Sequence, residues 1–202
     1  MPYLRSCPPQ PEPIDCRILT AALDLFVENG YHKVSIHEVQ KQAGVSIGSI
    51  YNYFGGKEGI AQALYEHILR ELDDLVDSIR TEHNSPWQQC RALITALFNY
   101  TETHRNIIAF VFHAKHTEFI SDEPLTSLSS PFVKMRQIVQ QGIACGELRP
   151  LDAWVAAANI FGGAIRLIQL RLDGVIEQPL PHYIDMLLQS IAQGVCIPDK
   201  SK

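Results

Sequence analysis

A serine stands between two glycines in residues 44–48, where the chain reads Gly-Val-Ser-Ile-Gly. This G-x-S-x-G spacing is the pattern of the nucleophile elbow of serine hydrolases, in which a sharp strand-to-helix turn exposes the serine hydroxyl. The elbow needs a buried strand before it, whereas residues 37–43 are polar and have helical spacing. The sequence also offers no pairing of a nucleophile with a base or of an acid with a base. We therefore predict that Ser46 is not a nucleophile and that the chain is not an enzyme.

Histidines suggest a second kind of chemistry, metal binding. His113 and His116 are three residues apart, close to Glu118, and residues at this spacing share one face of a helix. Two imidazoles do not complete a metal site, and no Glu-x-x-His pair on another predicted helix supplies further ligands. We expect neither a metal nor a cofactor, and we interpret both histidines as polar residues of a pocket wall or of the surface.

Two short helices joined by a tight turn are predicted over residues 35–54. Ser35 can cap the first helix, and Glu38, three residues later, completes the pattern of a capping box. This helix ends at Gly44, because glycine tolerates the left-handed backbone of a helix C-terminus. The second helix covers about residues 46–54. Two helices around such a turn form a helix-turn-helix motif, whose second helix enters the major groove of DNA.

The second of these helices carries groups that suit DNA. It begins with Ser46, Gly48 and Ser49, whose small side chains let hydroxyls and helix N–H groups bond phosphate oxygens. Tyr51 and Asn52 add a phenol and an amide, which can contact the DNA backbone or base edges. The sequence therefore predicts that double-stranded DNA is a partner.

The elements that position these groups are predicted to be helices throughout. Apolar residues recur at helical spacing, and no stretch alternates as a strand would. We expect an all-α protein of about nine helices, with a mobile polar loop at 120–130. The expected helices cover about residues 14–29, 35–44, 46–54, 57–80, 85–103, 105–119, 131–142, 151–172 and 181–194.

Three parts of the chain are expected. Residues 1–11 are rich in proline and form a flexible arm, residues 12–72 form the DNA-binding domain, and residues 73–202 form a second domain. The five cysteines are scattered and predict no disulfide framework, which favours the reducing cytoplasm. No uninterrupted apolar stretch reaches the length of a membrane span, and we expect no membrane partner.

Taken alone, the charge balance of the whole chain argues against DNA binding. The chain has 17 Lys+Arg and 22 Asp+Glu, a formal net charge of −5, whereas nucleic-acid-binding proteins usually have a basic excess. The excess is local here, because Lys33, Lys41 and Lys57 outnumber Glu38 between residues 33 and 57. We expect DNA to be held with few cations, mainly through helix N-termini, hydroxyls and two-fold symmetry.

Many residues at fixed spacing within about residues 12–72 resemble the DNA-binding domain of TetR-family transcriptional regulators. They are Ile18 through Phe26, Gly30-Tyr31, Ser35, and Ala43-Gly44-Val45-Ser46-x-Gly48-Ser49-x-Tyr51-x-Tyr53-Phe54-x-x-Lys57-Glu58. Further along, Gly142-x-x-x-Gly146-Glu147-Leu148-Arg149 resembles the lead-in to the eighth helix of that family. The resemblance implies a homodimeric repressor whose C-terminal domain binds a small molecule.

The resemblance also implies roles for individual residues. The positions that would meet the DNA backbone are Ser35, Ser49, Tyr51, Asn52 and Lys57, and those at the tip of the recognition helix are Ser46, Ile47 and Gly48. Ile47 departs from the family pattern, in which a polar or basic residue is more usual. An apolar side chain cannot donate to guanine, but it can touch a thymine methyl group.

The predicted helix at about 151–172 is apolar on more than one face, and apolar residues also line the last predicted helix, at about 181–194. By pattern alone, they form either a central core or a symmetric four-helix interface with a second copy. The family resemblance favours the dimer.

The expected effector is an unidentified small molecule held among the middle helices. Candidate residues of its pocket are Phe98, Phe110, Phe112, His113, His116, Phe132, Met135, Trp154, Phe161 and Arg166. Arg166, a cation in an apolar helix, could pair with an anionic ligand or with a carboxylate across the dimer. A regulator of the same fold that lacks ligand control, or that acts as an activator, remains the alternative.

Overall fold

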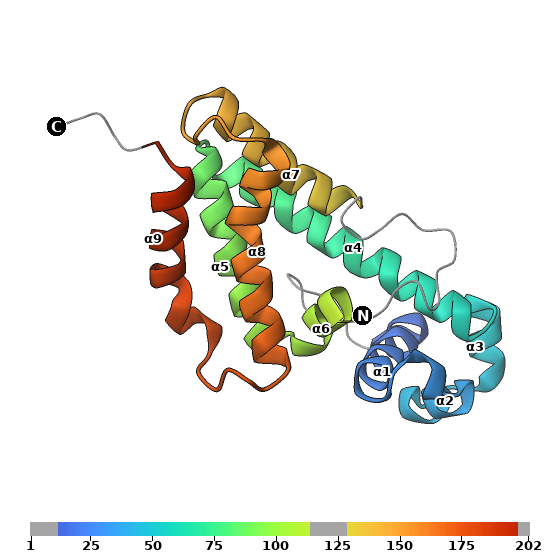
Figure 1. The fold of residues 1–202 in the computed structure, drawn as a ribbon. Coiled ribbons are helices and arrows are strands. Elements are labelled where there is room, and N and C mark those ends of the chain that lie inside the picture. Colours follow the sequence, from blue (N-terminus) through green and yellow to red (C-terminus); the bar gives the residue numbers. More distant parts are fainter. Residues whose placement is uncertain (1–11, 114–128, 198–202) are drawn as a thin grey trace. The chain divides into compact units, whose positions relative to one another are not determined.

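The computed structural model describes residues 12–113 and 129–197, and it is helical throughout (Figure 1). The helices are α1 (Ile14–Asn29), α2 (Ile36–Ala43), α3 (Ile47–Phe54), α4 (Lys57–Glu82), α5 (Pro86–Thr103), α6 (Arg105–His113), α7 (Ser130–Ala144), α8 (Ala153–Leu172) and α9 (Ile184–Val195), with short 3-10 turns η1 (Tyr31–Lys33) and η4 (Leu180–Tyr183). In this part of the chain, β pairing is limited to an isolated bridge between Leu148 and Cys196. The all-α fold that the sequence predicted is confirmed.

Two predicted helix starts are displaced by local chemistry. The eighth helix begins at Ala153, because the Asp152 carboxylate accepts from the next backbone N–H groups and acts as the N-cap. The ninth begins at Ile184, because residues 180–183 form the tighter turn η4. The predicted arm at 1–11, and most of the predicted loop at 120–130, lie outside the described residues.

The chain divides into two compact units. The first contains the described residues up to Leu72 together with α6 from Asn106 onward, and the second begins at Asp73 and resumes with α7. Compactness thus groups α6 with the first unit, which the predicted division after residue 72 did not anticipate. A hydrogen bond of 2.6 Å from Asn106 Nδ2 to Asp24 Oδ1 links α6 to α1 within this unit.

In the first unit, α1, α2 and α3 pack around a small apolar core with the beginning of α4 (Figure 1). The fully buried residues of this core come from all four helices and include Ile18, Ala22, Val39, Ile50, Ile60 and Leu64. Gly30 and Gly44 have φ values of +81° and +63°, which suit the sharp ends of α1 and α2. The α2–turn–α3 arrangement is that of a helix-turn-helix.

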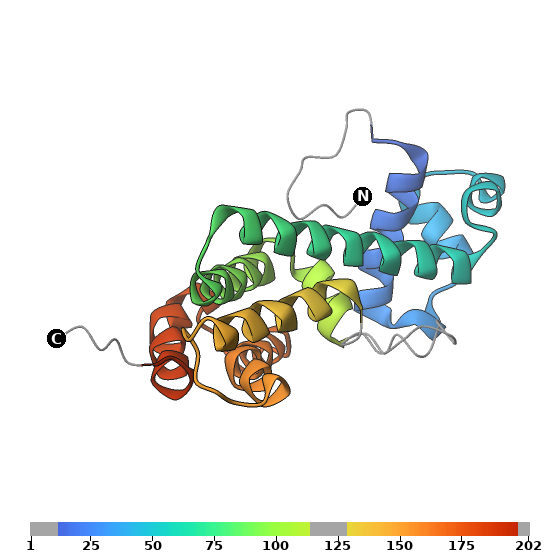
Figure 2. The same ribbon diagram turned by 90° about the horizontal axis from the view of Figure 1, so that it is seen from above.

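In the second unit, α5 packs against α7, α8 and α9, as the two views of the ribbon show (Figures 1 and 2). Its core contains the buried side chains Ile94, Phe98, Ile138, Ile160 and Ile168. At one edge, the Lys134 ammonium on α7 bonds the carboxylates of Asp73 and Asp77 on the last part of α4. This unit presents α8 and α9 as neighbouring helices.

Candidate nucleic-acid interface and associated surfaces

The first helix of the motif, α2, is closed by a capping box. The Ser35 hydroxyl accepts from Glu38 N, while the Glu38 carboxylate accepts from the Ser35 N–H and hydroxyl at 2.7 Å. The hydrogen bond from the Ser35 backbone N–H lowers the pKa of Glu38, and the bond from the Ser35 hydroxyl lowers it further. The Ser35 hydroxyl, predicted to meet DNA, is therefore already engaged in closing α2, although the residue itself is exposed.

The second helix, α3, begins at a pair of serines. Ser46 is its N-cap, and its hydroxyl accepts from Ser49 N at 3.1 Å and lies 2.8 Å from Ser49 Oγ. Ser46 and Gly48 are exposed, and Ser49 and Ile47 are half-buried. The N-terminal end of the recognition helix therefore presents small polar groups together with its N–H groups.

Farther along α3, one face is buried and the other is open. Ile50 is fully buried in the core of the first unit, whereas Tyr51 and Tyr53 are 54% and 55% exposed, and Asn52 is exposed as well. Tyr53 was not among the predicted DNA contacts, yet it is as accessible as Tyr51. The exposed phenol and amide groups are suited to donate to phosphates or base edges.

Lys57, a predicted phosphate contact, is engaged within the protein. Its ammonium donates to the carbonyls of Tyr31 and Val34 at 3.0 and 2.9 Å, and it lies 4.2 Å from the centroid of the Tyr31 ring. An ammonium has three donors, so two of them are used on the connection between α1 and α2. Lys57 thus fixes the residues that precede α2, a role that its sequence position did not reveal.

Arg17 on α1 is a second cation of this unit that bonds the protein, and sequence reasoning missed it. Its Nη2 donates to the carbonyls of Ala43 and Gly44 at 2.6 and 2.8 Å, across 26 and 27 residues of sequence. No local pattern signals a contact at this separation. Lys33 and Lys41, by contrast, are exposed.

The predicted pocket residues are distributed over the two units. Phe110 is buried in the first unit, with Phe112 half-buried and His113 exposed. Phe98, Met135 and Phe161 are buried in the second unit, where Phe132 is half-buried. His116 lies outside the described residues. These residues remain pocket candidates.

Two pocket predictions do not agree with the structure. Trp154 is 55% exposed, and its ring lies 4.0 Å from the guanidinium carbon of Arg136 on α7. Arg166 is also exposed, 3.4 Å from the Gln169 side chain on its own helix. Both residues point away from the core because they lie on the outward half of α8. They belong to a surface and not to an enclosed wall.

Helix α8 is uncovered along much of its length. Among the described residues, it is the one helix that is long and apolar enough to cross a membrane. Length and composition alone are weak evidence for a membrane span, because core helices of soluble proteins meet the same test. Only 28% of its most apolar window is buried in the chain. Apolar and small residues therefore face outward here, notably Val155, Ala158 and Gly162.

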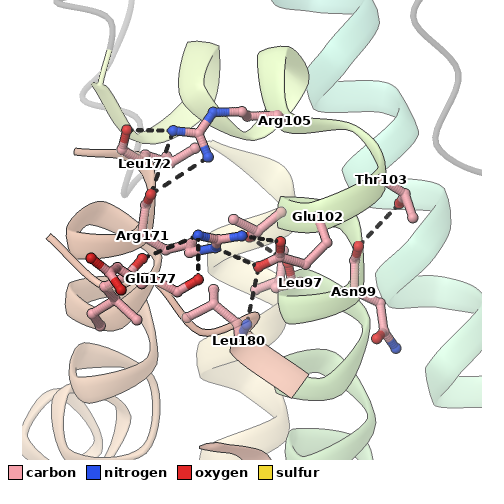
Figure 3. Close-up of polar contacts among 11 residues, drawn as sticks. Leu97, Asn99, Glu102, Thr103, Arg105, Arg171, Leu172, Glu177 and Leu180 are labelled. Carbon is pink, nitrogen blue, oxygen red and sulfur yellow. Dashed lines mark hydrogen bonds and ion pairs between the residues drawn. The ribbon is translucent and has the colours of Figure 1, made fainter. Parts of the chain in front are cut away.

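The C-terminal end of α8 is fixed by an arginine network (Figure 3). Arg171 makes a bidentate ion pair with Glu102 on α5, at 2.9 and 2.8 Å, and these bonds lower the pKa of Glu102. The same carboxylate accepts from Leu180 N, and Arg105 donates to the carbonyls of Arg171 and Leu172. The network holds the connection between α8 and α9 against α5.

The opposite end of these helices is fixed by residues 147–149. The Glu147 carboxylate accepts from Ser85 Oγ and Trp87 N at the start of α5. The Arg149 guanidinium donates to the carbonyls of Gln193 and Cys196 at the end of α9. These bonds explain the Gly-Glu-Leu-Arg pattern as a connection between three helices.

The described residues contain no group of three or more His, Cys, Asp or Glu that could hold a metal ion. In the same ranges, Cys16 and Cys90 are buried thiols, and burial raises the pKa of Cys90 to about 12. This thiol is therefore unsuited to act as a nucleophile.

Comparison with known proteins agrees with this geometry. The family model for bacterial regulatory proteins of the tetR family matches residues 18–64. The chain is similar to the fatty acid metabolism regulator protein of Bacillus subtilis, with 26% identity over 156 residues that cover 76% of this chain and 80% of the relative. It is also similar to the transcriptional regulator BetI 1 of Chromohalobacter salexigens, with 32% identity over 93 residues and 46% of each chain.

A solved structure shares the fold. The transcriptional regulator FadR from Bacillus subtilis, solved in complex with stearoyl-CoA, aligns with a TM-score of 0.75 and 23% identity over 88% of this chain and 97% of its own. These proteins are named as regulators and not as enzymes, in agreement with the prediction from the sequence. Residues 18–64 carry the helix-turn-helix domain of the tetR family of bacterial regulatory proteins, and the chain is a DNA-binding transcriptional regulator.

Proposed function

We propose that the chain is a homodimeric repressor that binds a palindromic operator in the cytoplasm and is released from it by a small molecule. The observation that carries the proposal is the outward face of α8 and α9, which the described part of the chain leaves open. An apolar helix must be covered on most sides, and a second copy that uses the same face would cover it symmetrically.

Glycines on this face support a close approach of another chain. A Cβ atom built at Gly162 or at Gly194 meets no atom within 4 Å. Glycine inside a helix costs about 1 kcal/mol relative to alanine, and the chain's own packing does not require it at these positions. A partner helix lying directly on the backbone would require it. Asn159 and Arg166, also exposed on α8, favour a protein partner over lipid.

A similar argument supports DNA contact at the tip of α3. A Cβ atom at Gly48 would make only ordinary contact, 3.7 Å from Ser46 Oγ, so the fold accepts a side chain there. The absence of one leaves the helix N-terminus open to a phosphate. Ser46, Ser49, Tyr51 and Asn52 would add hydroxyl, phenol and amide contacts, and Ile47 would meet a thymine methyl group.

In the dimer, two α3 helices would enter successive major grooves, about 34–36 Å apart. An effector bound in the second unit would release DNA by favouring dimers in which this spacing is wrong. Such a shift requires the effector to bind the released form more tightly, by the same factor as it weakens the operator complex. The buried aromatic residues of the second unit suit an apolar effector.

The names of the relatives support fatty-acyl thioesters as the first effectors to test. The experiment is native mass spectrometry of freshly purified protein, followed by titration of stearoyl-CoA into its complex with a selected operator duplex. We expect the mass spectrum to show twice the mass of one chain, and we expect stearoyl-CoA to dissociate the protein from the operator duplex. A monomer would contradict the dimer, and an operator affinity unchanged by a ligand that demonstrably binds would favour a regulator without ligand control.

A further inference from the structure

The guanidinium of Arg17 reaches from α1 to the turn of the helix-turn-helix. One nitrogen, Nη2, lies 2.6 Å from the Ala43 carbonyl and 2.8 Å from the Gly44 carbonyl. Ala43 is the last residue of α2, and Gly44 is its C-cap. The contact therefore joins α1 to the C-terminal end of α2, immediately before the recognition helix α3.

The carbonyls at this end of α2 need donors. A helix leaves its last four carbonyls without partners inside the helix. The backbone N–H groups of Gly44 and Val45 donate to the carbonyls of Lys41 and Gln40, and the Arg17 guanidinium donates to the carbonyls of Ala43 and Gly44. A positive charge is also favourable here, because the helix dipole makes its C-terminus negative.

Gly44 is shaped for this contact. Its φ of +63° is left-handed, and a Cβ atom at this residue would lie 2.8 Å from Arg17 Nη2. Glycine therefore suits this position in two ways, through its backbone conformation and because a Cβ atom would displace the guanidinium from the turn. Asparagine tolerates the left-handed region, so Gly44→Asn keeps the backbone conformation and displaces the guanidinium.

The turn determines where the tip of α3 lies. Only Val45 separates Gly44 from the N-cap Ser46. A change in the backbone of the turn therefore also displaces the exposed N-terminus of α3. We propose that Arg17 is a positioning residue for DNA recognition, which uses its charge on the turn and not on a DNA phosphate. The alternative role, a phosphate contact by the same guanidinium, predicts a different dependence on salt.

The two roles are separated by binding measurements on Arg17→Ala. The probe is a duplex selected from random DNA by the wild-type protein, with an unrelated duplex as the non-specific reference. We expect operator affinity to fall roughly tenfold, with unchanged non-specific affinity and an unchanged slope of log affinity against log salt. Arg70→Ala, which removes an exposed arginine of α4 in the same unit, is the matched control and should bind as wild type does.

A double-mutant cycle with Gly44→Asn tests the contact itself. We expect Gly44→Asn to weaken operator binding in the wild-type background and to cost several-fold less in the Arg17→Ala background, where the space is free. Equal costs in both backgrounds would overturn the proposal. A parallel loss for operator and unrelated DNA, with a shallower salt slope, would identify a phosphate contact instead.

Circular dichroism checks that each variant is folded. Arg17→Lys is a second variant, which keeps the positive charge but replaces the guanidinium by a shorter side chain with a single ammonium group. We expect it to bind the operator with an affinity between those of wild type and Arg17→Ala. Wild-type affinity of all folded Arg17 variants would overturn the positioning role. A wild-type protein that selects no duplex would instead contradict DNA binding as such.

Discussion

The Lys57 ammonium lies over the Tyr31 ring, 4.2 Å from its centroid, and donates to the Tyr31 carbonyl at 3.0 Å. Together with its bond to the Val34 carbonyl, this contact fixes the residues that lead into α2. Arg17 fixes the residues that lead out of α2. Two cations of the DNA-binding unit therefore hold α2, the first helix of the helix-turn-helix, at its two ends.

Replacing Lys57 by Met should destabilise the protein more than it alters the salt dependence of DNA binding. Charged hydrogen bonds contribute about 1.5–3 kcal/mol each, and the variant loses two of them, so we expect the free energy of unfolding to fall by at least about 3 kcal/mol. Urea unfolding measures this change. Lys41→Met, at an exposed position, should leave stability within about 0.5 kcal/mol and lower the salt slope. The reverse pattern would show that Lys57 mainly holds phosphate.

Replacing Gly162 by Glu should produce a folded monomer. The open space around Gly162 accepts the side chain within one subunit, and removing a helical glycine favours the helix by about 0.5 kcal/mol or more. Two carboxylates brought together across a symmetric interface would oppose association. Sedimentation velocity gives the mass, and Gln137→Glu on the exposed side of α7 is the control. A Gly162→Glu protein that stays dimeric at micromolar concentration would disprove the α8 interface.

Replacing Gly142 by Ala should destabilise the second unit. A Cβ atom at Gly142 would lie 2.7 Å from Leu148 Cδ1 and 3.2 Å from Pro86 Cβ, in a buried contact. Overpacking of this kind costs about 1–3 kcal/mol. Shortening Leu148 to Ala frees the space, so in urea unfolding the double variant should lose less than the sum of the two single losses. Strict additivity would mean that the two residues do not compete for space.

Replacing Glu102 by Gln should destabilise the protein at neutral pH but not in acid. The bonds from Arg171 lower the pKa of Glu102 below its ordinary value of 4.5. The carboxylate therefore adds stability above pH 4.5, and this contribution disappears as the pH falls through the lower folded-state pKa. Urea unfolding of wild type and variant should differ at pH 7 and converge toward pH 3. Glu28→Gln, on the exposed end of α1, should show no such convergence, and a difference that grows in acid would contradict the ion pair.

Local signals in the sequence predicted most of the fold. Ser35 with Glu38, Ser46, and the glycines at residues 30 and 44 mark the helix ends of the DNA-binding unit, because caps and left-handed turns depend on residues within a few positions. The fixed spacing of these residues also indicated the family.

Contacts between distant residues could not be predicted. The partners of Lys57 and Arg17 lie 23 to 27 residues away, and nothing in a single sequence reports such pairs. The same reason explains Trp154, whose apolar character suggested an interior position. Which face of α8 is covered depends on the packing of α5, α7 and α9 and not on composition.

The engaged cations sharpen the meaning of the net charge of −5. With Arg17 and Lys57 bound within the protein, Lys33 and Lys41 are the exposed cations of the described helix-turn-helix region. A dimer would then neutralise about four phosphates, which corresponds to a slope of about −4 for log affinity against log salt. Fluorescence anisotropy of the wild-type protein on a selected operator, between 50 and 300 mM salt, measures this slope. We expect saturable binding with a slope near −4, whereas a slope near −10, or no preference for any duplex, would contradict recognition by two sparsely charged α3 helices.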